Sequence, residues 1–215
     1  MNLTPDSVAA LDVLRVWPQD FHWYIIPLFA FVIYMYAVEI ERKNWDIVFA
    51  GLAFWAMDWL NEIINGLILH FSNYSALWTV GGDSTYVILV GLNAEISLMF
   101  AMAGIGFAKM LPKDKSLKIF GVPNRLAFAL GNSIFCVLVE VVLNQAQGLL
   151  WAWDFWNVSL LGLIPIVLFG YSHFMIVSFW VHDMASIKNK IKVVSFLGIL
   201  DIILLVLFVF VLGWI

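Results

Sequence analysis

The amino-acid sequence predicts an all-α, polytopic membrane protein that forms a single transmembrane domain over residues 1–215. Hydrophobic residues make up 63% of the chain and charged residues only 12%, whereas soluble domains contain about 45–50% apolar and about 25% charged residues. Six segments have the length that a spanning helix needs, about 20 residues. The net charge of −4 excludes a basic nucleic-acid-binding module, and the apolar content excludes a disordered chain.

The six spans are joined by short connections, so no separate soluble domain is expected. A short amphipathic helix over residues 5–18, bounded by Pro5 and Pro18, precedes the first span and is expected to lie on the outer membrane surface. A turn at residues 81–83 leads into the third span, and Pro165 predicts a kink in the fifth. The predicted spans cover residues 22–39, 46–70, 86–110, 124–148, 157–181 and 193–215.

Basic residues predict the orientation in the membrane. Ten of the eleven lysines and arginines fall in or beside three connections, and Arg15 alone lies on the other side. Because basic loops stay in the cytoplasm, connections 40–45, 111–125 and 182–192 are expected to be cytoplasmic, with both termini outside. The ten residues are Arg42, Lys43, Lys109, Lys113, Lys115, Lys118, Arg125, Lys188, Lys190 and Lys192.

Several chemistries lack their residues in this sequence. No lysine lies in the interior of a predicted span, since Lys109 falls at the very end of the third, and this excludes a retinal Schiff base. Neither H-E-x-x-H nor C-x-x-C occurs, which argues against a zinc enzyme. The single cysteine, Cys136, is expected to be a small apolar filler in the fourth span. We therefore expect no cofactor and no dedicated metal site, although carboxylates can hold a cation.

Four acidic residues within the spans are the strongest functional signal. Glu62, Glu95 and Glu140 lie on three consecutive spans, each roughly 5 Å to the outer side of the middle, and Asp58 lies near the middle of the second span. A charged side chain in a membrane helix costs about 2.5–3.5 kcal/mol on insertion scales, so each one needs a reason. Crowded carboxyls in an apolar medium cannot all ionise, and some must stay protonated, share protons or hold a cation. We expect these four residues to be the catalytic groups.

Further polar and aromatic residues on the same helices are expected to bind the substrate. Asp58, Glu62 and Asn65 recur at i, i+4 and i+7, which places them on one helix face. Asparagines in membrane helices also join helices, and a lone histidine is often a core residue, so packing is the alternative interpretation for this set. The candidate binding residues are Asn65, Asn93, Asn144, Trp55, Trp59, His173 and Asp201.

Three functions fit these features. The first is an integral membrane enzyme that uses the carboxylates for isomerase-like acid–base chemistry on an apolar lipid or isoprenoid-type substrate. The second is a proton-coupled carrier or ion pathway. The third is an accessory subunit of a membrane complex. The expected partners are the lipid bilayer and an apolar small-molecule or lipid ligand, with a homo-oligomer open and nucleic acid excluded.

The second and third spans resemble a known family. Asp58 and Glu62 one turn apart are followed by Leu77-Trp78, by Gly82-Asp83-Ser84-Thr85-Tyr86 and by Glu95. Over about 40 residues this order resembles the EXPERA group, the emopamil-binding-protein-like sterol isomerases, in which a histidine stands where this chain has Asp58. The resemblance implies a multi-helix pocket in which a double bond is shifted by protonation at one carbon and deprotonation at another. It also implies that Glu62 and Glu95 are the proton-handling pair.

Overall fold

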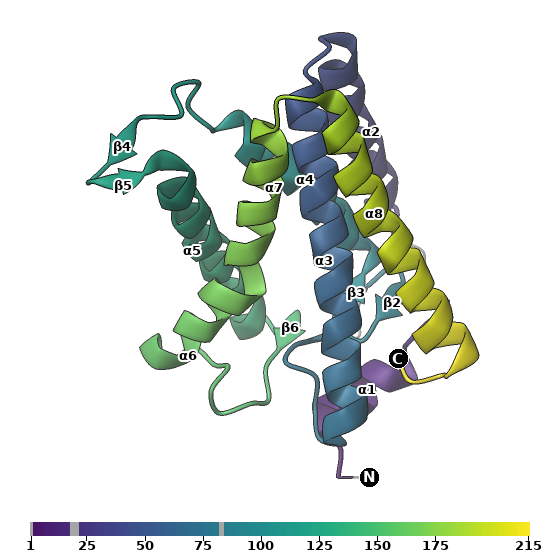
Figure 1. Cartoon of the computed structure of the whole chain (residues 1–215). Helices are drawn as coiled ribbons and strands as arrows, with labels where there is room; N and C mark the ends of the chain where they lie inside the picture. The colour runs from purple at the N-terminus through teal and green to yellow at the C-terminus, as the bar shows by residue number, and fades with distance from the viewer. Residues whose placement is uncertain (1, 18–21, 82–83) are drawn as a thin grey trace.

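The protein is a bundle of helices with three short antiparallel strand pairs in its connections (Figure 1). The computed structural model describes residues 2–17, 22–81 and 84–215. The helices are α1 (Pro5–Asp12), α2 (Ile25–Glu41), α3 (Trp45–Ser72), α4 (Ala94–Lys109), α5 (Asn124–Gln145), α6 (Leu160–Pro165), the π-helix η1 (Ile166–Ser172), α7 (His173–Asp183), α8 (Ile187–Leu205) and the π-helix η2 (Val206–Val211). The strand pairs are β1 (Thr79–Val80) with β6 (Leu149–Leu150), β2 (Val87–Leu89) with β3 (Leu92–Asn93), and β4 (Lys118–Ile119) with β5 (Val122–Pro123).

Over the described residues the structure is mostly helical, and four helical segments there are long and apolar enough to cross a membrane. They are α3, α5, the continuous α6–η1–α7 segment and the α8–η2 segment. The first and third predicted spans correspond to α2 and α4, which contain 17 and 16 residues. These lengths are close to the lower limit of about 17 residues for a spanning helix. A multi-pass membrane protein follows, while the number of six spans stays a prediction.

The prediction of one helix over residues 86–110 is wrong at its start. Residues 87–93 form the β2–β3 hairpin, in which Val87 pairs with Asn93 and Leu89 with Leu92. Asn93 has an extended backbone, and its side chain accepts the Ile96 N–H at 2.8 Å. This N-cap starts α4 at Ala94, because a side-chain acceptor at that position replaces the missing turn of the helix. The hydropathy of the segment did not distinguish a buried hairpin from a helix.

The other boundaries differ from the predictions by a few residues. The N-terminal helix ends at Asp12, and its predicted boundary at Pro18 lies outside the described residues, as do Gly82 and Asp83 of the predicted turn. At Pro165 the fifth span changes from α-helix to the π-helix η1. The last span begins at Ile187 rather than 193, so part of the predicted 182–192 connection is helical.

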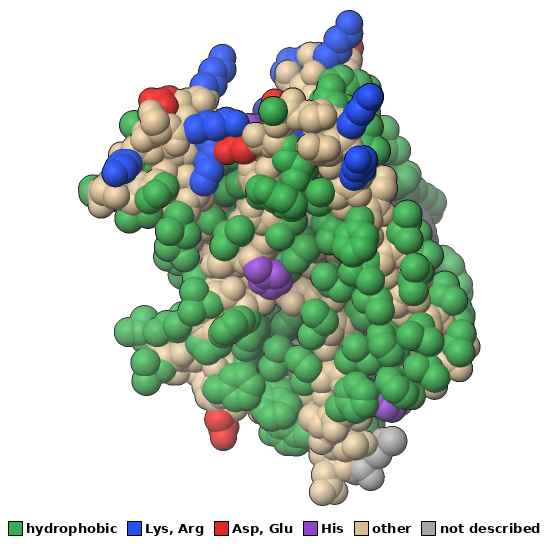
Figure 2. All heavy atoms as spheres, in the orientation of Figure 1, with side chains coloured by type: hydrophobic (Ala, Val, Ile, Leu, Met, Phe, Trp, Pro, Cys, Tyr) green, Lys and Arg blue, Asp and Glu red, His purple; other side chains and the backbone are tan. Residues whose placement is uncertain are grey.

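The charged residues divide the molecule into two ends. Figure 2 shows Lys and Arg side chains gathered at the top of the view, over the β4–β5 region and the ends of the long helices, above a face that is mainly hydrophobic. Both described termini lie at the opposite end, together with α1 (Figure 1). We call these the basic end and the terminal end. The arrangement agrees with the predicted separation of charges, and the side of the membrane on which each end lies stays a prediction.

The helix α3 is the centre of the bundle. It packs on α2, α4, α7 and α8, whereas α5 packs mainly on η1 and α7. Small residues allow α3 and α4 to approach closely, since a Cβ added to Gly104 would lie 2.8 Å from the carbonyl oxygen of Gly51. Close approach through small residues is a common way for membrane helices to associate. The position of α5 on the far side of α7 leaves a space between α5 and the α3–α4 pair.

Two connections cover this space at the terminal end. The strand β1 pairs with β6, with Thr79 opposite Leu150. The Trp153 indole donates hydrogen bonds to the carbonyl oxygens of Ser75 and Ala76 at 3.2 and 3.0 Å. These contacts join the connection after α3 to the connection after α5. The two connections therefore form one cap.

Ion pairs join the helices at the basic end. Glu39 of α2 is 1% exposed and accepts a 2.6 Å hydrogen bond from Lys109 of α4. Arg125 of α5 forms two bonds, of 2.8 and 2.9 Å, with the carboxylate of Asp183 at the end of α7. A bidentate arginine–carboxylate pair fixes orientation as well as distance. The starts and ends of these helices are thus tied together across the bundle.

Lys190 is buried in the first turns of α8, although the sequence placed it in a cytoplasmic connection. Its side chain is 1% exposed, and its Nζ donates to the carbonyl oxygens of Val181 and His182 at 2.7 and 2.5 Å. It also pairs with Asp46 at 3.0 Å. Lys190 therefore supplies a charged donor to two carbonyls in the last turn of α7, where helical hydrogen bonds run out.

The variant Lys190→Met is expected to lower the free energy of unfolding by about 2–4 kcal/mol, because two buried carbonyls lose charged donors. Methionine keeps most of the side-chain volume, so the loss reports the hydrogen bonds. Melting temperature in detergent measures the effect. Lys192→Met on the exposed face of α8 is the control and should change little. Equal melting temperatures for the two variants would contradict the capping role.

Candidate functional site

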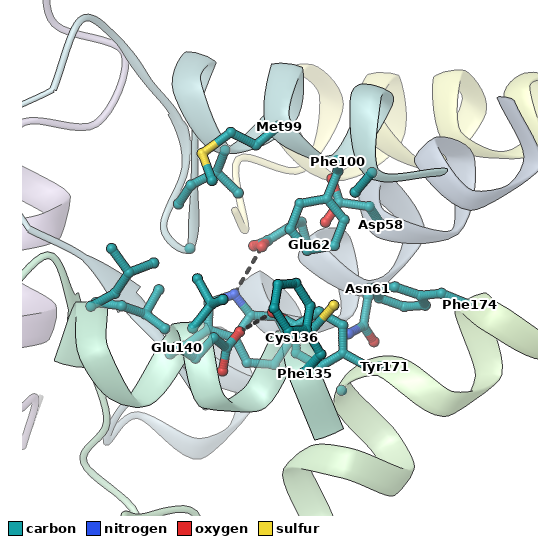
Figure 3. A pocket seen from close by; sticks show the side chains of 18 of the residues that line it. Asp58, Asn61, Glu62, Met99, Phe100, Phe135, Cys136, Glu140, Tyr171 and Phe174 are labelled. Carbon is teal, nitrogen blue, oxygen red and sulfur yellow. Dashed lines mark hydrogen bonds between the residues drawn. The ribbon is translucent and has the colours of Figure 1, made fainter. Parts of the chain in front are cut away.

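A cavity of about 170 Å³ occupies the space between α3, α4, α5 and the η1–α7 segment (Figure 3). Its walls are mostly apolar and aromatic. Three of the four predicted catalytic acids line it, namely Asp58 and Glu62 from α3 and Glu140 from α5. Figure 3 shows the carboxyl groups of Glu62 and Glu140 reaching toward the cavity from these two helices. Its walls also include Trp78, Gly91, Met99, Phe100, Phe135, Cys136, Val139, Trp156, Tyr171 and Phe174.

Glu62 is held by a tryptophan of the cap. The side chain of Glu62 is 3% exposed, and its Oε1 accepts the Trp78 indole N–H at 2.8 Å. The other oxygen, Oε2, is buried and has no hydrogen-bond partner among the described residues. A buried polar atom without a partner is costly unless a ligand or a proton satisfies it. The hydrogen bond from Trp78 thus fixes Oε1 of Glu62, and Oε2 remains available to a proton or a ligand.

Asn65 fixes the tryptophan that holds Glu62. It is fully buried, and its Nδ2 donates to the Trp78 carbonyl oxygen at 2.8 Å while its Oδ1 accepts the Leu77 N–H at 2.8 Å. The sequence predicted Asn65 as a binding residue on the same face as Glu62. The shared face is present, but Asn65 contacts the cap backbone and does not line the cavity. Its role is to position Trp78.

Glu140 is paired with Tyr171. The Tyr171 O–H donates to Glu140 Oε1 at 2.5 Å, and both residues line the cavity. Tyr171 lies in the π-helix η1, a rare conformation that is frequent at functional sites. An ionised carboxylate is a better acceptor than a neutral one for a short hydrogen bond from a phenol. The hydrogen bond from Tyr171 stabilises the charged form of Glu140, against the larger cost of burying that charge in apolar surroundings.

Asp58 joins the cavity to a fourth acid. Asp58 is 2% exposed, and its Oδ2 has no hydrogen-bond partner among the described residues. It lies within electrostatic range of Glu62, Glu140 and Asp201, the last on α8. Within the described part of the chain, no ion pair links these carboxyls to a basic side chain. Because like charges at low dielectric repel, at least part of the group must carry protons.

Glu95 lies apart from this group, which corrects the expectation of three glutamates at one site. Its Oε1 accepts the Tyr24 O–H at 2.8 Å and the Thr85 backbone N–H at 2.6 Å, and it does not line the cavity. The cause is the hairpin before α4. Since α4 begins at Ala94, Glu95 falls in its first turn and joins the chain near Thr85 to α2.

The other predicted binding residues also lie outside the cavity lining. Asn144 donates to the Leu149 carbonyl oxygen at 2.9 Å, and Trp55 donates to Ser97 Oγ at 3.0 Å. These bonds hold the end of α5 and the α3–α4 contact. Asn93 caps α4, and Trp59 packs beside the β2–β3 hairpin. His173 packs against Phe174, and Asp201 lies within electrostatic range of Asp58.

Sequence reasoning missed several lining residues. Tyr171 had a usable signal, because a tyrosine between Gly170 and Ser172 inside a span is a polar group among small neighbours. Trp78 entered only through a motif, since its contacts with Glu62 and Asn65 cross from a connection to a helix. Cys136 lines the cavity instead of merely filling the bundle.

The donor set of the site does not have the pattern of a metal centre. Among the described residues, no group of three or more histidine, cysteine, aspartate or glutamate side chains is placed to hold a metal ion. The three lining acids come instead with an indole, a phenol and apolar walls. Such surroundings suit proton transfer to an apolar ligand better than cation binding.

Comparisons with known proteins extend over nearly the whole chain. A family model described as an uncharacterized membrane protein family matches residues 4–210. A protein of Archaeoglobus fulgidus, described as an uncharacterized protein, is 47% identical over 212 residues, which are 99% of this chain and 99% of that protein. No solved structure matches this chain. The family match includes every residue that lines the cavity.

Proposed function

We propose that this chain, which belongs to an uncharacterized membrane protein family, is an acid–base enzyme that isomerises an apolar, unsaturated ligand inside its cavity. One observation carries the proposal. Asp58, Glu62 and Glu140 line an apolar cavity with no basic side chain among its lining residues. A carboxylic acid kept neutral in apolar surroundings is a competent proton donor, and an ionised partner is a competent acceptor.

The hydrogen bonds suggest which acid does which task. Trp78 occupies one oxygen of Glu62, so a proton on Oε2 would point to the unpartnered side. Tyr171 donates to Glu140, which favours the ionised form. Glu62 would add its proton to one carbon of a C=C bond, and Glu140 would remove a proton from the carbon beside the resulting cation. The C–H electron pair becomes the new double bond, and the ligand neither gains nor loses atoms overall.

Aromatic walls support a cationic intermediate. The faces of aromatic rings attract positive charge, and Phe100, Phe174 and Trp156 line the cavity. Trp55 and Trp59, which the sequence placed among the candidate binding residues, do not line the cavity. The resemblance to the emopamil-binding-protein-like isomerases supports the same type of chemistry, with one change. The proton-handling pair would be Glu62 and Glu140, because Glu95 lies outside the cavity.

Deuterium incorporation tests the reaction across a range of candidate substrates. Purified protein in deuterated buffer is incubated with a panel of apolar alkenes that includes a ring-unsaturated sterol and a linear polyisoprenoid. Isomerisation through protonation is expected to add solvent deuterium to one panel member, detected by mass spectrometry. Glu62→Gln and Glu140→Gln should each lower this rate by about 100-fold or more, the usual contribution of a general acid or base.

Glu41→Gln is the control, because Glu41 is exposed at the end of α2, far along the chain from the cavity residues. It should retain the rate of the unmodified protein. Deuterium incorporation that persists unchanged in both Glu62→Gln and Glu140→Gln would reject the proposed roles. Melting temperatures of all variants show whether a lost rate reflects lost folding.

A proton or ion pathway is the second candidate, and the position of Asp58 favours it. Asp58 lies within electrostatic range of both the cavity acids and Asp201 on α8. Successive carboxyls of this kind suit a proton relay. Proton flux into liposomes, followed with an internal pH-sensitive dye, tests this candidate. Flux that is lost in Asp58→Asn and Asp201→Asn supports it, and no flux in the unmodified protein rejects it.

A further inference from the structure

Three residues that line the cavity are also exposed on the outside of the protein. Met99 of α4 is 44% exposed, and Phe135 and Val139 of α5 are 58% and 36% exposed. A side chain that both lines a cavity and faces outward marks a place where the cavity is open. We call the place between these three residues the lateral opening. Its rim is entirely apolar, as suits contact with lipid chains rather than with water.

Buried aromatic side chains cover the cavity at the terminal end and on its inner sides. Trp78 and Trp156 stack with ring centroids 5.8 Å apart beneath the cap at the terminal end. On the inner sides, Phe107 of α4 and Phe174 of α7 are 8% and 2% exposed. The lateral opening persists because α5 packs on η1 and α7 rather than on α4. A ligand is therefore expected to reach the acids from the side, through the bilayer interior.

The size of the cavity limits what fits inside. An apolar cavity of about 150 Å³ holds one benzene-sized molecule, and this cavity measures about 170 Å³. A membrane lipid is several times larger than benzene, so only part of one can enter. No lysine, arginine or histidine is among the lining residues, so an anionic head group finds no partner there. The part that enters must be hydrocarbon.

We infer that the cavity binds the apolar end of a long-chain lipid, which enters tail first through the lateral opening while its polar head stays in the bilayer surface. Binding of the lipid tail does not depend on the proposed function, whereas the reaction that follows binding rests on it. The double bond within reach of Glu62 and Glu140 is then one near the apolar end of the chain. Lipids whose unsaturation lies beside the head group would bind without presenting it to the acids.

Photo-crosslinking tests the direction of entry. The full-length protein in liposomes is exposed to two fatty-acyl lipids that differ only in the diazirine position, at the chain end or beside the head group. After irradiation, the chain-end probe is expected to modify Cys136 and Glu140 themselves, as located by fragmentation of the labelled peptides. The head-group probe is expected to modify only outward-facing residues. Equal labelling of Cys136 and Glu140 by both probes would overturn the inference.

A bulky residue at the lateral opening supplies the second measurement. Val139→Trp and Met99→Trp place a large ring at its two sides, and each should lower cavity labelling by the chain-end probe at least about tenfold, equivalent to about 1.4 kcal/mol. Leu138→Trp is the matched control, because Leu138 is the neighbouring α5 residue, is 56% exposed and does not line the cavity. Labelling that is insensitive to both rim variants would also overturn the inference. Cavity labelling without deuterium incorporation would leave tail-first binding in place and reject the isomerase.

Discussion

Replacing Gly91 by alanine is expected to disrupt the site and destabilise the protein strongly, although the change adds only one methyl group. A Cβ at Gly91 would lie 2.5 Å from both Asn65 Nδ2 and Glu62 Oε2, and closer still to Trp78 Nε1. These atoms belong to buried side chains that hydrogen-bond to one another or to the cap backbone. They cannot move apart without breaking those bonds, and overpacking of this kind costs about 1–3 kcal/mol before the bonds are counted.

With one or two hydrogen bonds lost in addition, the total for Gly91→Ala is about 2–4 kcal/mol. For a protein of this size, that corresponds to a fall in melting temperature of roughly 5–15 °C. Gly106→Ala is the matched control, because no heavy atom lies within 4 Å of its added Cβ and alanine is the better helix former. It should keep or raise the melting temperature. A Gly91→Ala protein as stable as Gly106→Ala would show that the Glu62–Trp78–Asn65 contacts are not packed as described.

Replacing Asn65 by alanine is expected to have an effect of similar size. The change leaves the Leu77 N–H and the Trp78 carbonyl oxygen without the fully buried Asn65 side chain as their partner. Each buried group without a partner costs about 1–3 kcal/mol. The cap should loosen around Trp78, and Glu62 should lose its fixed orientation. We therefore expect both a lower melting temperature and a lower rate of deuterium incorporation.

A double-mutant cycle separates positioning from general stability. Trp78→Phe removes the indole N–H that holds Glu62 and keeps an aromatic ring. If Asn65 acts on catalysis through Trp78, the rate loss in the double variant will be smaller than the sum of the two single losses. Additive losses would mean that Asn65 acts independently. Asn61→Ala, on the same helix and at the cavity wall, controls for the loss of an amide from α3.

The helical core of the fold was predictable because the bilayer imposes a length on each apolar segment. The predictions for α3, α5, α7 and α8 depended on this length, and each corresponds to a candidate span. The β2–β3 hairpin was not predictable in the same way. The hairpin strand contains Val87, Ile88 and Leu89, which are as apolar as the residues of a membrane-spanning helix. Whether this segment forms a hairpin or a helix depends on the Asn93 N-cap and on strand pairing within the fold.

The site was predictable only where its residues share a helix. The spacing of Asp58 and Glu62 places both on one face of α3, and both line the cavity. Whether Glu140 lies beside them depends on how α5 packs. The predicted depth in the membrane placed Glu140 near Asp58 and Glu62 correctly, but the same reasoning was wrong for Glu95. Trp78 and Tyr171 entered the site through a connection and a π-helix. Neither position follows from a regular helical period.

Contacts with other elements hold both ends of α5, and the cavity lies between these contacts. At the basic end Arg125 ties α5 to Asp183, and at the terminal end β6 pairs with β1 directly after α5. Between these points Val139 of α5 and Met99 of α4 both line the cavity at the lateral opening. The helix α5 is thus held by contacts at both of its ends, and its middle borders the lateral opening. For the proposed lipid ligand, the width of the entrance would then depend on how far the middle of α5 can bend between its two fixed ends.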